Sequence, residues 1–136
     1  MVITIDETDP RPIYQQIVDE VRRGLVVGTL QAEDPLPSVR QLAGDLKVNP
    51  NTVQQAYREL ERQGLVQVRR GKGTFVAEMR DGGRARQRTE LVTSVAKRAL
   101  REAHRHGLGA EELVEAIRRA ANDSEPAAPS GAGGNA

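Results

Sequence analysis

Apolar residues recur at helical spacing in three segments of the first half of the chain. A stripe of this kind predicts a helix that buries one face. The first predicted helix covers residues 12–27, the second begins at residue 38, and the third begins at residue 50. Their apolar positions are Ile13, Ile17, Val18, Val21 and Leu25, then Val39, Leu42, Ala43 and Leu46, then Val53, Ala56, Tyr57 and Leu60. We therefore expect three helices that pack on a common core.

The ends of the second and third helices carry residues suited to capping. The Ser38 hydroxyl can accept a hydrogen bond from a backbone N–H in the first turn of its helix. The Gln41 side chain, three residues later, can in turn accept one from the backbone N–H of Ser38, which makes a capping box. Asn49 precedes Pro50, which fills a first-turn position where a missing N–H costs nothing. Gly64 supplies the stop of the third helix. These signals place the two helices close together, as a helix-turn-helix.

A short hairpin is predicted directly after the third helix. Residues 65–69 and 74–76 have strand composition and surround a basic, glycine-rich tip. The tip is formed by Arg70, Gly71, Lys72 and Gly73, whose glycines permit a tight turn. Together the segments predict a mainly α fold with a small β wing, a winged helix-turn-helix. Leu36 is expected in its core, after a loop at residues 29–35, and residues 2–5 are expected as an edge strand.

The rest of the chain is predicted to be a linker, two helices and a tail. Residues 80–88 are rich in glycine and arginine and are interpreted as a solvated tether, or else as arginines that reach phosphates beside the wing. Helical patterns follow at residues 89–106 and 110–121, and residues 122–136 have a disordered composition. The expected division is a winged helix-turn-helix domain at 1–77, a linker at 78–88, a two-helix segment at 89–121 and the tail.

The two C-terminal helices carry more apolar surface than they can cover by themselves. Two short helices bury little area against each other. A second copy of the chain would cover the excess, so a homodimer is expected. The expected interface residues are Leu91, Val92, Val95, Ala99, Leu113 and Ile117.

The third predicted helix leaves unusual side chains off its apolar stripe. They are polar and mostly uncharged amides and hydroxyls: Asn49, Asn51, Thr52, Gln54, Gln55 and Arg58. A solvated face more often carries Glu and Lys, whereas amides hydrogen-bond base edges in the major groove. A recognition helix presents its N-terminal residues there. This pattern indicates sequence-specific binding to double-stranded DNA. Besides forming the turn of the wing, Gly71 and Gly73 would let its backbone approach the minor groove, with Arg70 and Lys72 beside it.

Three blocks of the sequence carry a family resemblance. LPSVRQLA, VNPNTVQQAYRELERQGL and RRGKGTFV stand in this order within residues 10–77, which are similar to the N-terminal domain of the GntR family of bacterial transcription regulators. The short remainder resembles the YtrA-like subgroup. This resemblance implies DNA contacts by Ser38 and Arg40 in the first block and by Asn49, Asn51, Thr52 and Gln54 in the second. It also implies a transporter operon as a plausible target.

Charge is distributed in agreement with a DNA-binding motif. The 136 residues carry a net charge of +1. Residues 1–36 carry −4, residues 37–76 carry +4 and the remainder carries +1. The positive excess therefore falls where phosphate contacts need it. The chain has no cysteine, no apolar run of membrane-spanning length and no signal-peptide layout, so a cytoplasmic protein is expected.

Other chemistry has weak support in the sequence. His104 and His106 are two residues apart on a predicted helix and lack carboxylates at fitting spacing, so a metal site is disfavoured. No nucleophile–base pair or phosphate-binding loop is visible, and we expect neither an enzyme nor a cofactor. The leading hypothesis is a homodimeric repressor that binds an inverted-repeat operator, with a possible small-molecule effector. The alternative is a non-specific nucleoid-type or adaptor protein.

Overall fold

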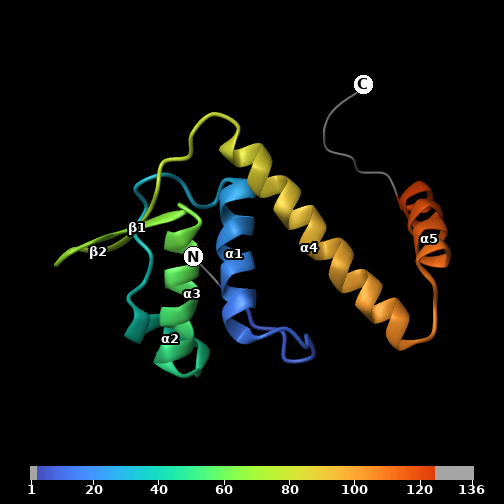
Figure 1. Cartoon of the computed structure of the whole chain (residues 1–136), viewed down its shortest axis with the longest axis horizontal. Helices are drawn as coiled ribbons and strands as arrows, with labels where there is room; N and C mark the ends of the chain where they lie inside the picture. The colour runs from blue at the N-terminus through green and yellow to red at the C-terminus, as the bar shows by residue number, and fades with distance from the viewer. Residues whose placement is uncertain (1–2, 125–136) are drawn as a thin grey trace. The chain divides into compact units, whose positions relative to one another are not determined.

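The computed structural model describes residues 3–124, which form five helices and one hairpin (Figure 1). The elements are α1 (Ile13–Val27), α2 (Val39–Leu46), α3 (Pro50–Arg62), β1 (Val66–Arg69), β2 (Gly73–Val76), α4 (Gly83–Arg105) and α5 (Ala110–Asp123). The chain divides into two compact units, with the boundary between Val92 and Thr93, inside α4. The first unit therefore contains the predicted winged helix and the beginning of α4.

The core of the first unit lies where α1, α2 and α3 meet the wing. Its buried residues follow the predicted stripes: Ile17, Val18, Val21, Leu25, Leu30, Leu36, Leu42, Ala43, Val53, Ala56, Tyr57, Leu60, Leu65, Val66 and Val76. Tyr14, Val39 and Leu46 are half-buried beside them, whereas Ile13 is exposed. This core confirms the predicted three-helix packing.

Ser38 and Asn49 both cap their helices as predicted, but the return bond to the Gln41 side chain, which would complete a capping box, is not found among residues 3–124. The Ser38 hydroxyl accepts a hydrogen bond from the backbone N–H of Gln41 at 3.0 Å. The Asn49 side chain accepts one from the N–H of Asn51 at 2.8 Å. Each bond satisfies an N–H group that has no partner inside its own helix. The caps thus fix where α2 and α3 begin.

The wing is an antiparallel pair in which Val66 faces Val76 and Arg69 faces Gly73. Gly71 and Gly73 have φ angles of +76° and +120°, which confirms that the tip needs glycine. The segment before α2 also pairs with β2. Leu36 N–H donates to the Thr74 carbonyl at 2.9 Å, and Pro35 bridges Phe75. The expected loop therefore pairs with the free edge of β2. Pro35, which has no N–H to donate, fits such an edge position.

Two sequence-based expectations for the first unit are wrong. Residues 3–5 form no strand, and Ile3 and Ile5 instead pack at the border of the core. The predicted tether is helical from Gly83 onward, because α4 begins six residues before the expected start at Thr89. The Arg84 guanidinium donates to the Leu25 carbonyl at 3.2 Å. The first turns of α4 are therefore fastened to the end of α1.

The second unit contains the later part of α4 and all of α5. Ala103 is buried, but none of the residues of α5 is. Asn122 and Asp123, expected in a disordered tail, belong to α5, and residues 125–136 of that tail lie outside the described residues. Across residues 3–124, no helix combines the length and apolar character needed to cross a bilayer. The second unit is thus two helices with much uncovered surface.

Candidate DNA-binding surface

The exposed side of α3 carries the side chains that the sequence assigned to base reading. Asn51, Gln54, Gln55 and Arg58 are exposed, and Thr52 is half-buried. In the described residues, Gln54, Gln55 and Arg58 make no side-chain bond to the rest of the chain. The opposite side of α3 is held in the core by Val53, Ala56, Tyr57 and Leu60. The helix is thus rigidly placed with its polar face open.

A tyrosine in α3 positions the start of α2. The Tyr57 hydroxyl donates a hydrogen bond to the Pro37 carbonyl at 2.6 Å. Burial raises the pKa of this phenol above its ordinary value, so the hydroxyl keeps its proton. Ser38 and Arg40, which follow Pro37, are both exposed. The two predicted contact residues of α2 are therefore fixed relative to the recognition helix.

We expect Tyr57→Phe to lower the free energy of unfolding by about 1–2 kcal/mol, because the Pro37 carbonyl loses its donor. Tyr14→Phe is the matched control. Tyr14 is half-buried and its hydroxyl has no hydrogen bond among residues 3–124, so its loss should cost under about 0.5 kcal/mol. Urea denaturation measures both values. Equal stability of the two variants would show that the Tyr57 bond does not hold α2.

The two arginines of the wing, Arg69 and Arg70, differ in whether they have partners within the chain. Arg69 donates to Glu33 at 2.5 Å and lies over the Phe75 ring, 4.6 Å from its centroid. Its guanidinium is thus occupied within the wing. Arg70 and Lys72 are exposed at the tip, and neither has an ion-pair partner among residues 3–124. The free positive charge of the wing therefore lies beside Gly71 and Gly73.

A buried arginine joins three helices behind this surface. Arg22 of α1 is 5% exposed. Its Nη1 donates to Asp19 Oδ1 and its Nε to Gln87 Oε1, both at 2.8 Å, and its Nη2 donates to Gln63. Gln63 directly follows α3, and Gln87 lies in the second turn of α4. This arginine cluster (Arg22, Asp19, Gln63 and Gln87) was not predicted from the sequence.

The end of α3 carries a further charged contact. Hydrogen bonds from Arg62 and then Gln63 lower the pKa of Glu59 to about 2. Gln63 therefore donates to Glu59 while it accepts from Arg22. Both functions of its amide are in use, and its orientation is fixed at the end of the recognition helix.

Within residues 3–124, no group of three potential ligands is close enough together to hold a metal ion. His106 contacts Glu102 at 3.1 Å on the second unit, where both are exposed. A surface pair of this kind is a weak interaction.

The fold and its polar surface define a class of protein. A capped helix-turn-helix with an open, amide-rich second helix and a basic wing is a winged-helix DNA-binding domain. The sequence model described as "Bacterial regulatory proteins, gntR family" matches residues 13–76, from α1 to the end of the wing. The chain belongs to the GntR family of transcription regulators.

Similar proteins cover nearly the whole chain. The HTH-type transcriptional repressor YtrA of Bacillus subtilis (strain 168) is 35% identical over 122 residues, which are 90% of this chain and 94% of that protein. The uncharacterized HTH-type transcriptional regulator YhcF of the same organism is 42% identical, covering 79% and 88%. A GntR family transcriptional regulator from Listeria monocytogenes is similar in structure, with a TM-score of 0.61, 32% identity, and coverage of 82% and 96%. These relatives are transcription regulators, and the chain is not an enzyme.

Proposed function

We propose that this GntR-family protein is a homodimeric repressor that binds an inverted-repeat operator. The observation that carries the proposal is the open polar face of α3, held by Tyr57 and the caps. The similarity of the chain to YtrA, which is named a repressor, supports repression rather than activation. In this role, α3 lies in the major groove of the DNA, and α2 and the wing contact the DNA phosphate backbone on the two sides of that groove.

Base reading is assigned to the first turns of α3. Asn51, Thr52, Gln54 and Gln55 supply donors and acceptors that suit base edges. Ser38 and Asn49 each use a side-chain oxygen as a cap, so they contribute mainly by placing the helices, although the Ser38 hydroxyl can still donate to a phosphate. Arg40, Arg58, Arg70 and Lys72 supply charge for phosphate contacts.

Dimerisation is assigned to the apolar surface of α4 and α5. Val92, Val95 and Ile117 are 62%, 49% and 52% exposed. Leu91, Ala99 and Leu113 are half-buried in the single chain. Large apolar side chains left exposed are typical of an interface, and within residues 3–124 no residue of α5 is buried. A two-fold dimer would present two recognition helices to half-sites about 10 bp apart, or a multiple of that spacing.

A non-specific nucleoid-type protein is the alternative, and an adaptor that uses the winged helix for protein contacts is its variant. Binding without base reading would depend on Lys and Arg across the whole surface. Here the middle of the α3 surface is formed by amides. This composition favours sequence-specific binding.

Two substitutions test this division between base reading and phosphate contact, on an operator selected from random DNA and on scrambled DNA. Gln54→Ala should weaken binding to the operator by about 1–3 kcal/mol and leave binding to scrambled DNA unchanged. Lys72→Ala should weaken both and reduce the slope of log affinity against log salt by about one. Binding isotherms over a salt series measure both effects.

The matched controls are Gln31→Ala, outside the surface, and Lys97→Ala on α4. Both side chains are exposed, and both variants should bind as the unchanged protein does. If Gln54→Ala and Lys72→Ala lose the same affinity on both DNAs, base reading by α3 is refuted. If no operator can be selected at all, the non-specific alternative holds.

A further inference from the structure

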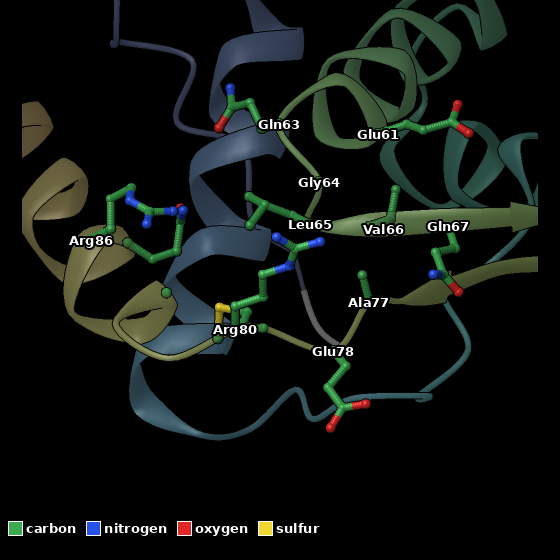
Figure 2. A pocket seen from close by; sticks show the side chains of 13 residues that line it. Glu61, Gln63, Gly64, Leu65, Val66, Gln67, Ala77, Glu78, Arg80 and Arg86 are labelled. Carbon is green, nitrogen blue, oxygen red and sulfur yellow. The ribbon is translucent and has the colours of Figure 1, made fainter.

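The first unit has a pocket that the proposed DNA contacts do not use. It lies between the base of the wing and the first turns of α4 and has a volume of about 580 Å³ (Figure 2). Leu65, Val66 and Ala77 form its apolar part, and Arg80, Arg86 and Gln87 line the side toward α4. Its volume lies in the range of pockets that hold small molecules, but more of its lining is polar than apolar, so polar contacts would hold most of an occupant.

Two arginines give the pocket positive charge. In Figure 2 the Arg80 side chain extends toward Leu65, and Arg86 lies apart from it at the α4 side of the pocket; both residues belong to the lining. Neither guanidinium has an ion-pair partner among residues 3–124. Glu61 and Glu78 also belong to the lining, but the figure shows their carboxylates pointing outward. The interior therefore presents unpaired donors.

Gln87 adds a buried donor that has no partner among residues 3–124. The residue is 6% exposed, and its Oε1 faces Arg22 because an arginine Nε can only donate. The amide NH2 group consequently points elsewhere. It makes no hydrogen bond within the part of the chain that the structure describes. A buried donor without an acceptor is costly, and such groups are usually satisfied by ordered water or by a bound molecule.

We propose that this pocket binds a small anionic molecule through a carboxylate or phosphate group. Arg80 and Arg86 would pair with the anion, and the Gln87 amide would donate to one of its oxygens. Charge-assisted hydrogen bonds of this kind are stronger than neutral ones, and arginine suits both anions. The apolar wall of Leu65 and Val66 would contact the remainder of the molecule.

The pocket is well placed to influence the DNA-binding surface. Its lining includes Gln63, which directly follows α3, and Val66, which begins β1. The Arg22 guanidinium holds Gln63 and Gln87 together from behind. A bound anion would thus touch the recognition helix, the wing and α4 at once. This regulatory consequence rests on the proposed function, and it requires that the anion bind differently to the free and DNA-bound arrangements.

Isothermal titration of the full chain with inorganic phosphate, citrate, glucose 6-phosphate and glucose tests the pocket. We expect at least one of the three anions to bind and glucose not to bind. Gln87→Glu is the most informative variant. The new carboxylate still accepts the hydrogen bond from Arg22, but it replaces the amide NH2 donor with a negative charge that repels the anion. Both Gln87→Glu and the double variant R80Q/R86Q should lose affinity for the anion by about tenfold or more.

The matched control is R40Q/K72Q, which removes two charges from the DNA-binding surface and should keep its affinity for the anion. The proposal is overturned if no anion binds up to roughly 10 mM. It is also overturned if R40Q/K72Q loses the anion while R80Q/R86Q retains it, since the anion would then sit on the DNA-binding surface. Thermal denaturation confirms that each variant is folded.

Operator binding without any anion separates this proposal from the proposed function. Gln87→Glu should bind the operator as the unchanged protein does, because Gln87 is buried and is not among the assigned DNA contacts. If the unchanged protein binds anions but no operator, the pocket stands and the proposed function fails. If the unchanged protein binds the operator but no anion, the proposed function stands and the anion pocket is refuted.

Discussion

Arg22→Ala is expected to lower the free energy of unfolding by about 3–5 kcal/mol, the range for breaking a buried charged network by removal of one member. Three acceptors lose their donor at once, on Asp19, Gln63 and Gln87. Asp19 keeps its pairing with Arg11, but the two amide oxygens are left without the guanidinium. Urea denaturation measures the loss of stability.

Arg23→Ala is the matched control, since it lies next in α1 and also forms an ion pair. Its side chain is 54% exposed and contacts Glu20 at 2.9 Å. A surface pair of this kind contributes under about 1 kcal/mol. Equal costs for Arg22→Ala and Arg23→Ala would show that the arginine cluster does not hold the three helices together.

Charge placed on the apolar surface of α4 and α5 is expected to abolish the dimer. In the double variant V95E/I117E, carboxylates replace two exposed apolar side chains of the proposed interface. The chain should sediment as a monomer, and affinity for the operator should fall by about 100-fold or more, since the second half-site no longer binds intramolecularly. Lys97→Glu is the control, because helical spacing places it opposite Val95 on α4.

Operator geometry provides an independent check on the same dimer. Moving one half-site by about 5 bp, half a helical turn, turns it to the other side of the duplex. The unchanged protein should then bind about as weakly as V95E/I117E does. Undiminished affinity would mean that the two winged helices bind independently. A monomeric unchanged chain at micromolar concentration would refute the dimer itself.

Local sequence signals were sufficient to predict most of the first unit. The apolar stripes of α1, α2 and α3 predicted which residues are buried, because helical spacing leaves one face for the core. Ser38 and Asn49 marked the beginnings of α2 and α3, since a cap acts within a few residues of its own position. The glycines at the wing tip marked the turn for the same reason.

Contacts between distant segments could not be predicted in this way. Residues 80–88 have the composition of a tether, yet Arg84 and Gln87 bind groups in α1, about sixty positions earlier. The pairing of Pro35 with Phe75 likewise joins segments far apart. Arg22 lies on the edge of an apolar stripe, where a charged residue is usually solvated. Only the arrangement of three helices around it explains its burial.

The open face of α3 has a consequence for how such a regulator can diverge. Gln54, Gln55 and Arg58 form no side-chain hydrogen bond or ion pair within residues 3–124, whereas the apolar residues on the opposite side of α3 are buried in the core. Surface substitutions of this kind change stability by only about 0.5 kcal/mol. After gene duplication, a copy could therefore acquire a new target sequence through these three positions without passing through unstable intermediates. The scaffold and the specificity of the protein are free to evolve at different rates.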